Sequence, residues 1–537
     1  MLRPILRGKN KFSLPLSHFL VVLLALVGCS EEGSSAVKGD APSTTPAVRV
    51  TATIDISRKF QRIDNFAASD AWSCQFVGNW PENKKNAIAD LLFSTQLDAN
   101  GQPKGIGLSL WRFNIGAGSS QQGEQSGIKD EWRRAESFLD NDGSYNWQRQ
   151  AGQVWFLKAA QARGVSKFLA FPNSPTVNLT RNGKAFASNG TPNLAPARYE
   201  AFSDYLADVI QGVERVHGVT FNYISPVNEP QWDWSDGGQE GTPFMNAEVA
   251  GIVRALNTSL ARRNLTTKID IAEAGKIDYL YQEADKPNRG NQIDAFFSKN
   301  SPHYVADLPH VSKVISGHSY FTTSPAGQAV ASRKQLASKV ATVPGLEFWQ
   351  SEYCILGDNA GEIDGNKRVL GIDPAIYLAR VIHNDLVVAN ATAWQWWLAI
   401  SPYNYKDGLI YIDQNKTDGN FYESKMLWAL GNYSRFIRPG AERVDLQVAG
   451  DRKDENDALL ASAYLDTQQK KLIMVAVNPS ILPVQMNMEV KGATIRNIIP
   501  YVTSDKENLT PGSPLQGNKE ITVAPRSVIT FVADLQL

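Results

Sequence analysis

The 537-residue sequence has no excess charge of either sign, because 54 lysines and arginines balance 54 aspartates and glutamates. Nucleic-acid-binding proteins usually carry a basic surplus, so we expect no nucleic-acid partner. Histidine is scarce, with six residues, and the His-Glu-x-x-His pattern is missing. The Gly-x-Ser-x-Gly elbow and the P-loop motif are missing as well. These absences argue against zinc peptidases, hydrolases with a serine elbow and P-loop nucleotidases.

A short apolar run near the N-terminus, Phe19–Val27, follows a basic segment that extends from Arg3 to Lys11. The run is too short to span a bilayer of about 30 Å, so it predicts a signal peptide. It ends in Leu26-Val27-Gly28-Cys29, which resembles a bacterial lipobox. We expect a lipoprotein signal peptide at residues 1–28, lipidation of Cys29 and a lipid anchor in a membrane. The expected location is the bacterial cell envelope, at the outer membrane or cell surface; simple cleavage near Gly28 is the alternative.

Composition divides the rest of the chain into a tether and two folded regions. Residues 29–47 are rich in Ser, Pro, Thr and Gly, which predicts a flexible tether. Residues 66–432 alternate short apolar strands with amphipathic helices, a pattern typical of a (β/α)8 barrel of the α/β class. Residues 433–537 contain strand patterns without helical periodicity, which predicts an attached β-sandwich. The strand expected within residues 48–65 has no helix after it, so we expect it to join that sandwich.

Eight strands and five helices of the barrel can be placed from the sequence. The expected strands are Asn65–Ala68, Leu108–Ile115, Lys167–Phe171, Asn222–Pro226, Lys268–Ile271, Val314–Ser319, Leu346–Ser351 and Ala391–Leu398. The expected helices are Trp147–Arg163, Ala197–Val216, Asn246–Arg263, Ala326–Ala341 and Ile376–Ala389. The sandwich strands expected are Leu459–Tyr464, Lys471–Val477, Gln485–Val490 and Ser527–Leu535.

Two glutamates stand where a barrel places its catalytic groups. An apolar strand runs into Asn228-Glu229-Pro230, and another ends on Glu352. Catalytic residues of such barrels lie at the C-terminal ends of strands. Two carboxyl groups at strand ends suit glycoside hydrolysis, in which one protonates the leaving oxygen and the other attacks the anomeric carbon. We expect Glu229 to have a raised pKa and Glu352 to stay ionised; a loop cap and a structural ion pair are the alternative roles.

Other strand ends carry polar and aromatic residues that could bind a sugar. Arg112 and Asn114 share one face of their strand, and we expect Arg112 to steady Glu352 or bind substrate, unless it forms a purely structural salt bridge. His318 and Tyr320 share a face of another strand. Trp396 is the expected platform for stacking on a sugar, with core packing as the alternative. Further subsites are expected from aromatic residues after other strand ends, namely Trp72, Trp232 and Trp234.

Taken in order, these segments resemble glycoside hydrolase family 30. The resemblance is carried by Phe66–Trp72, Trp111–Asn114, Phe171–Ser174, Asn228–Gln231, Gly317–Tyr320, Gln350–Glu352, Trp394–Leu398 and Gly431–Gly440. It implies a barrel fused to a side β-sandwich, retention of configuration, and neither metal nor cofactor. It also implies Glu229 as acid/base and Glu352 as nucleophile, with a sugar-binding shell formed by Asp70, Trp72, Arg112, Asn114, Asn173, Asn228, Trp234, His318, Tyr320 and Trp396.

Within that family the chain looks most like the endo-β-1,6-galactanase branch. Other branches act on xylan, β-1,6-glucan or glucosylceramide, or release single β-linked sugars. The expected partner is therefore an oligosaccharide or polysaccharide. A surface glycan-binding lipoprotein that lacks catalysis is the competing hypothesis, and the presence of both acids argues against it.

Three cysteines are present, and Cys29 is assigned to the anchor. Cys74 follows the first predicted barrel strand and Cys354 the seventh. In a closed barrel these strands are separated only by the eighth, so both loops should lie at one rim. A Cys74–Cys354 disulfide is our hypothesis, and two buried free thiols are the alternative.

Overall fold

The computed structural model describes residues 48–450, 457–515 and 520–536. The predicted signal peptide, the tether and Cys29 lie outside these residues. Among the helices that the described ranges contain, none is long and apolar enough to cross a membrane.

A closed barrel of parallel strands confirms the predicted (β/α)8 fold. Strands β2 to β9 are hydrogen-bonded in chain order, and β9 pairs with both β8 and β2, which closes the ring. Nearly every strand residue is buried, because side chains fill the inside and helices cover the outside. The strands are β2 (Asn65–Ser69), β3 (Leu110–Asn114), β4 (Lys167–Phe171), β5 (Tyr223–Ile224), β6 (Lys268–Ala274), β7 (Val311–His318), β8 (Glu347–Glu352) and β9 (Ala393–Ser401).

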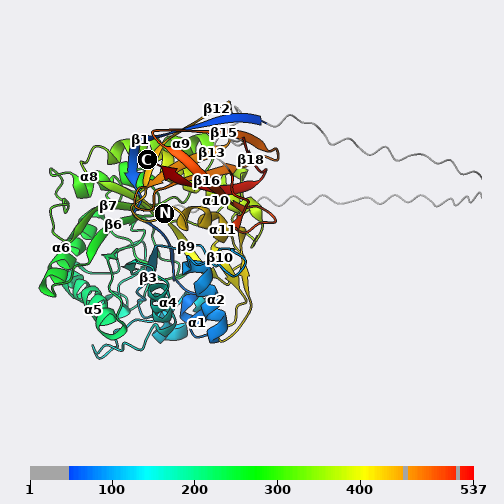
Figure 1. Cartoon of the computed structure of the whole chain (residues 1–537). Coiled ribbons are helices and arrows are strands. Elements are labelled where there is room, and N and C mark those ends of the chain that lie inside the picture. The colour runs from blue at the N-terminus through cyan, green and yellow to red at the C-terminus, as the bar shows by residue number, and fades with distance from the viewer. Residues whose placement is uncertain (1–47, 451–456, 516–519, 537) are drawn as a thin grey trace, which may run out of the picture. The chain divides into compact units, whose positions relative to one another are not determined.

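Amphipathic helices surround the barrel (Figure 1). In α5 (Tyr199–His217) the buried residues Phe202, Leu206 and Val213 recur at helical spacing, and Gly218, at φ 75°, ends the helix in the left-handed conformation. The remaining helices are α1 (Cys74–Val77), α2 (Glu82–Phe93), α3 (Ser119–Gln122), α4 (Ala151–Ala162), α6 (Asn246–Arg262), α7 (Asp278–Tyr281), α8 (Gln292–Phe297), α9 (Ala326–Val340), α10 (Ile372–His383) and α11 (Lys425–Ser434). A π-helical segment, Asn384–Val388, follows α10.

Two strands that the sequence did not predict extend the barrel sheet. β10 (Gly408–Ile412) pairs in parallel with β9, and β11 (Phe421–Glu423) pairs antiparallel with β10. They lie beside the end of β9, next to the site described below.

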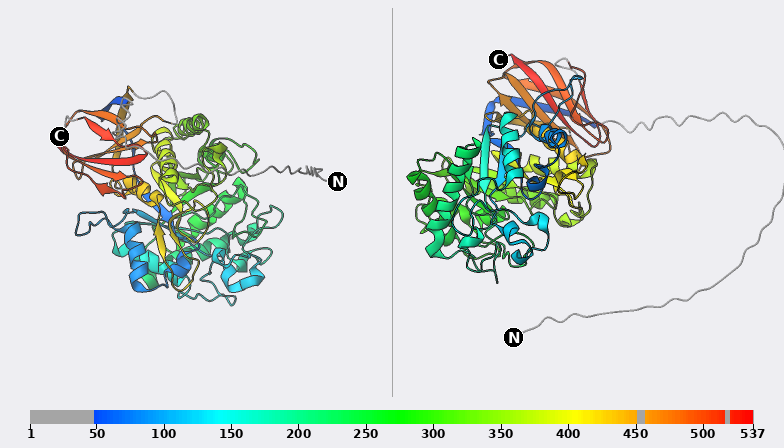
Figure 2. Two further views of the ribbon diagram at one scale, coloured as in Figure 1. Left: turned by 90° about the vertical axis from the view of Figure 1, so that its right-hand side faces the viewer. Right: turned by 90° about the horizontal axis from the view of Figure 1, so that it is seen from below.

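The second sheet is built from both ends of the described chain. Its long first strand, β1 (Val48–Arg62), lies between β12 and β15, antiparallel to the former and parallel to the latter. Figure 2 shows β1, in blue, among the orange and red C-terminal strands. The other strands are β12 (Glu442–Ala449), β13 (Leu460–Asp466), β14 (Lys471–Asn478), β15 (Val484–Lys491), β16 (Thr494–Thr503), β17 (Thr510–Pro511), β18 (Ile521–Val523) and β19 (Ser527–Gln536).

This sheet encloses its own apolar core. Side chains from β1, β14, β15 and β19 form one cluster, in which Ile54, Met474 and Phe531 are buried. The opposite face of β14 and β19, including Ile473 and Val528, belongs to the barrel's cluster instead. The second sheet therefore has a core of its own on one face and packs against the barrel with the other.

Candidate active site

The two predicted acids lie together in a cavity at the C-terminal end of the barrel. Glu229 follows β5, and Glu352 is the last residue of β8. The exposed fractions of Glu229 and Glu352 are 7% and 4%. The cavity has a volume of about 330 Å³ and is lined by Asn228, Glu229, Trp232, Trp234, Gln239, Tyr320, Phe321, Glu352, Leu356 and Trp397.

Glu229 and Glu352 are close neighbours across the barrel axis. One carboxylate oxygen of each, and Nδ1 of His318, all lie within 4.8 Å of one another. Pairs of catalytic carboxyls are about 5–5.5 Å apart in retaining glycosidases and about 6.5–9.5 Å apart in inverting ones. This close approach is nearer to the spacing of a retaining pair, in which no water molecule lies between the second carboxylate and the anomeric carbon.

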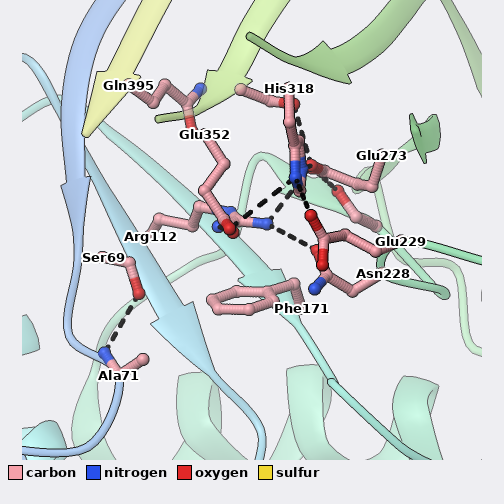
Figure 3. A network of polar contacts seen from close by, with 12 residues as sticks. Ser69, Ala71, Arg112, Phe171, Asn228, Glu229, Glu273, His318, Glu352 and Gln395 are labelled. Carbon is pink, nitrogen blue, oxygen red and sulfur yellow. Dashed lines mark hydrogen bonds and ion pairs between the residues drawn. The ribbon is translucent and has the colours of Figure 1, made fainter. Parts of the chain in front are cut away.

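Arg112 lies beneath this pair and is completely buried. Its NH1 donates to Glu352 Oε2 at 2.5 Å, and its NH2 donates to Asn228 Oδ1 and to Glu273 Oε2, each at 3.2 Å. The guanidinium also lies 3.7 Å from the ring centroid of Phe171. Figure 3 shows it between Glu352 and Asn228. Arg112 therefore steadies the Glu352 carboxylate from below, one of the two roles expected for it.

His318 and Tyr320 connect the carboxylates. Nδ1 of His318 lies 2.9 Å from Glu229 Oε1, and Nε2 lies 2.8 Å from Glu273 Oε2. The Tyr320 hydroxyl donates to Glu352 Oε1 at 3.0 Å. Burial raises the pKa of Tyr320 well above its ordinary value, so its hydroxyl stays protonated and able to donate.

Burial and the surrounding charges shift the pKa values of Glu229 and His318. Burial raises the pKa of the Glu229 carboxyl, and the negative charge of Glu352 adds to this effect, while the bond to His318 opposes it. For His318, burial acts to lower the pKa, but the carboxylates around it, Glu352 foremost, outweigh burial and raise the pKa to about 10. The raised pKa favours the protonated form of Glu229, which is the form that an acid catalyst needs.

Glu273 is the member of this network that the sequence reading missed. The predicted strand stopped at Ile271, whereas β6 continues to Ala274, so Glu273 also stands at a strand's C-terminal end. Burial would raise the pKa of Glu273, yet the Arg112 charge and the His318 contact lower it to about 2. The rule that identified Glu229 and Glu352, an acid ending an apolar strand, would have found Glu273 had the strand been extended.

The backbone is strained at these acids. Glu229 has φ 45° and Glu273 has φ 50°, values that residues other than glycine rarely adopt. The Glu229 N–H donates to the Glu273 carbonyl at 2.9 Å, which ties the two strained positions together. Strain of this kind persists where surrounding structure fixes it and is concentrated at functional sites.

The other predicted shell residues divide into those at the cavity and those behind it. Asn228 and Trp234 line the cavity. Asn173 supports Asn228 by accepting from its Nδ2 at 3.0 Å. Asp70 and Asn114 are fully buried behind the wall, where Asp70 Oδ1 accepts the Asn114 N–H at 2.7 Å. Trp72 also lies behind the wall, where its ring packs at nearly a right angle to that of Trp397, with centroids 5.3 Å apart.

The stacking tryptophan was assigned to the wrong face of β9. Trp396 is completely buried, packs against Tyr353 and Trp394, and donates its Nε1 to the Asp407 carbonyl at 2.8 Å. Trp397 is the residue that lines the cavity. Side chains alternate along a strand, so the pattern defines two pairs but not which pair points inward.

The predicted disulfide is absent, because Cys74 and Cys354 are both free and buried. The Cys354 thiol lies 3.8 Å from the Tyr320 hydroxyl. Burial raises the pKa of both thiols well above the ordinary value. The second alternative, two buried free thiols, replaces the disulfide hypothesis.

Glu229, His318 and Glu352 each present one atom that could bind a metal ion. In the observed arrangement His318 bonds to Glu229, and the Arg112 cation already neutralises Glu352. The hydrogen bonds and ion pairs among these groups account for the cluster without an ion.

A parallel barrel that holds two glutamates at this spacing, on the ends of its fourth and seventh strands, defines a glycoside hydrolase. The profile of O-glycosyl hydrolase family 30 matches residues 49–411. The chain belongs to this family.

Related proteins agree with that assignment. An endo-beta-1,6-galactanase of Hypocrea rufa is 26% identical over 444 residues, 80% of this chain and 81% of that protein. A glucuronoxylanase of Bacillus subtilis is 24% identical over 392 residues, 72% of this chain and 78% of that protein. The crystal structure of a conserved exported protein from Bacteroides fragilis has a TM-score of 0.83 and 34% identity, and it covers 90% of this chain and 100% of its own.

Proposed function

We propose that the protein is a retaining, endo-acting β-glycosidase whose substrate is β-1,6-galactan. The observation that supports retention of configuration is the close approach of the two acids: one oxygen of Glu229 and one of Glu352 lie within 4.8 Å of each other. In a closely spaced pair the second carboxylate attacks the anomeric carbon directly, because no water molecule fits between that carboxylate and the sugar.

The surroundings of the two acids assign their roles. Glu352 receives hydrogen bonds from Arg112 and Tyr320, which stabilise a carboxylate and leave it free to act as nucleophile. Glu229 is buried beside a cationic His318 and has a raised pKa, so it carries the proton that the leaving group needs. The environments separate an acid from a nucleophile within one site.

The reaction then follows a double displacement. Glu229 gives its proton to the glycosidic oxygen while Glu352 bonds to the anomeric carbon and the leaving sugar departs. Glu229, now ionised, takes a proton from a water molecule that attacks the same carbon, and the bond to Glu352 breaks. The product keeps the β configuration, and both carboxyl groups return to their initial state.

The choice of galactan rests on similarity to the Hypocrea enzyme, which is 26% identical over most of both chains. The Bacillus glucuronoxylanase, 24% identical over a shorter stretch, favours xylan as the second candidate. Because these identities are so close, the substrate requires a direct test.

That test is a product profile on β-1,6-galactan, arabinogalactan, glucuronoxylan, β-1,6-glucan and aryl β-glycosides, with proton NMR of the first anomer released. Galacto-oligosaccharides from β-1,6-galactan, initially β, would support the proposal. Products from xylan alone would change the assigned substrate to xylan. A monosaccharide as sole product would exclude internal cleavage, and an initial α anomer would exclude retention. Binding without hydrolysis of any substrate would favour a glycan-binding lipoprotein.

We also propose that lipidation of Cys29 holds the enzyme at the bacterial cell envelope. The lipobox-like Leu26-Val27-Gly28-Cys29 supports this proposal. The wild-type protein should partition with detergent and label with a radioactive fatty acid, whereas Cys29→Ser should do neither. Equal partitioning of both forms into the aqueous phase would reject the anchor.

A further inference from the structure

Glu273 lies under the reacting pair without reaching the cavity. It is completely buried and is not among the lining residues. Its Oε2 accepts from Arg112 at 3.2 Å, from His318 at 2.8 Å and from Ser351 at 2.8 Å, while Oε1 accepts from Ser225 at 2.8 Å. A side chain with both oxygens bonded in this way cannot contact a substrate in its present position.

The charges around Glu273 balance only when Glu229 is protonated. Arg112 and His318 are cations, and Glu273 and Glu352 are anions that bond to them. A proton on Glu229 completes a neutral group of five buried residues, whereas an ionised Glu229 would leave a net negative charge. A net charge in the protein interior is unfavourable, so the anions Glu273 and Glu352 both raise the free energy needed to remove the Glu229 proton.

We propose that Glu273 is a positioning residue whose negative charge keeps the protons of Glu229 and His318 in place and holds Arg112 against Glu352. This inference rests on the proposed roles of Glu229 and Glu352. It adds a third buried acid to the site, one that acts through its neighbours and does not touch the sugar. The ionisable groups in contact with Glu273 are Arg112 from β3, Asp270 from its own strand and His318 from β7. Glu352 from β8 pairs with both Arg112 and His318, and Glu229 after β5 contacts His318 through its side chain and Glu273 through its backbone.

Asp270 supplies a matched control, because Ser225 bonds to both Asp270 and Glu273. Burial, together with the charge of Glu273, raises the pKa of Asp270 well above its ordinary value. The raised pKa favours the neutral form of Asp270 beside a charged Glu273. Asp270→Asn preserves both the shape and the absence of charge, while Glu273→Gln preserves the shape and removes a charge.

Glu273→Gln can keep the hydrogen bonds of the native site. Its amide oxygen can accept from Arg112 and His318, and its NH2 can donate to the Ser225 hydroxyl. Any change in acid–base behaviour then reports the lost charge. Glu273→Asp keeps the charge on a shorter side chain and serves as the conservative variant.

The first readout is the pH dependence of kcat and KM on the polysaccharide. Removing one negative charge lowers the pH at which the coupled Glu229–His318 pair loses its first proton. For Glu273→Gln we expect the alkaline limb of the kcat/KM profile to shift to lower pH by about one unit. At pH values above the limb, kcat/KM should then be about tenfold lower than in the wild type, while KM should change less than about threefold. Asp270→Asn should keep the wild-type limb, and Glu273→Asp should recover most of the shift.

The second readout is the NMR titration of His318, which needs no substrate. The chain has six histidines, so the His318 signal can be assigned by comparison with His318→Gln. In the wild-type protein His318 should stay protonated to about pH 10, and in Glu273→Gln it should lose its proton at lower pH. An unchanged His318 titration in folded Glu273→Gln would overturn the proposal. So would an alkaline limb displaced by Asp270→Asn but not by Glu273→Gln.

The two proposals fail in different ways. If Glu229 and Glu352 are not the reacting pair, their own variants retain activity, whereas the His318 titration still tests Glu273. A melting curve would show whether Glu273→Gln folds. If it does not, Glu273→Asp and Asp270→Asn still test whether the negative charge lies on Glu273 and not on Asp270. A displaced limb in Asp270→Asn would then reject the inference.

Discussion

The floor and the rim of the cavity are built on opposite principles. On the floor, Arg112 and His318 are completely buried and bonded to carboxylates. On the rim, Phe321 is 60% exposed and Leu356 is 37% exposed. A packed floor fixes reacting groups in one geometry, whereas exposed loop residues gain their contacts from a ligand. The contrast indicates that the reaction is set by the barrel core and the substrate by the loops.

The largest effect is expected on the floor, from Glu352→Gln. This change removes the proposed nucleophile while keeping the shape of the side chain, so activity should fall by roughly 10⁴-fold or more on every substrate. Initial rates on polysaccharide and on an aryl glycoside would measure it. Comparable activity on either substrate would place the reacting pair elsewhere.

A large but substrate-dependent effect is expected from Glu229→Gln. Hydrolysis of the polysaccharide should fall by roughly 10²- to 10⁴-fold, because its leaving sugar needs a proton. Bond cleavage in a dinitrophenyl glycoside, whose leaving group needs no proton, should be affected much less. Pre-steady-state release of dinitrophenol would measure that step, and equal losses on both substrates would contradict the role of Glu229 as acid.

The pH profile of the wild-type enzyme tests the same residue without a mutation. Glu229 must be protonated to act as acid, so kcat/KM should fall as pH rises through its pKa. Because burial raises this pKa, the alkaline limb should lie above the ordinary glutamate value of about 4.3. The limb should be lost for dinitrophenol release, and its survival there would assign it to another group.

The same contrast explains what could be predicted from the sequence. The barrel, the family and the two strand-end acids follow from local patterns, because an apolar strand that ends on an acid is visible in a few residues. The N-terminal strand was expected to join the second sheet because no helix follows it, but its pairing with β12 and β15 was not predicted. Strands β12 and β16 were not predicted, since their many exposed and half-buried residues blur the alternation.

Three site assignments depended on information that local pattern does not contain. Alternation could not decide between Trp396 and Trp397, because both faces of a barrel strand are apolar. Glu273 was not predicted as a site residue, because the predicted strand ended at Ile271 whereas β6 continues to Ala274. Cys74 and Cys354 were placed at one rim by strand order, but strand order does not specify whether two thiols face each other.

A smaller effect is expected on the rim, from Phe321→Ala. Phe321 lines the cavity, with φ 58° and an exposed ring, so we expect its ring to contact the sugar on the leaving-group side. We expect about a fivefold loss of kcat/KM on polysaccharide and little change on aryl glycosides. The melting temperature should not fall. Ile481→Ala, which removes an 80% exposed side chain from the sandwich, is the control that should leave both substrates unaffected.

The smallest effect concerns the thiols of the packed interior. In a Cys29→Ser chain, Cys74 and Cys354 should resist alkylation while the protein is folded, because both are buried and protonated. Both should react after unfolding without a reductant, which mass spectrometry would detect. A requirement for reductant would restore the disulfide. Rapid labelling of Cys354 in the folded enzyme, beside Tyr320, would show that the floor opens to solvent, and the contrast between a fixed floor and an adaptable rim would then be lost.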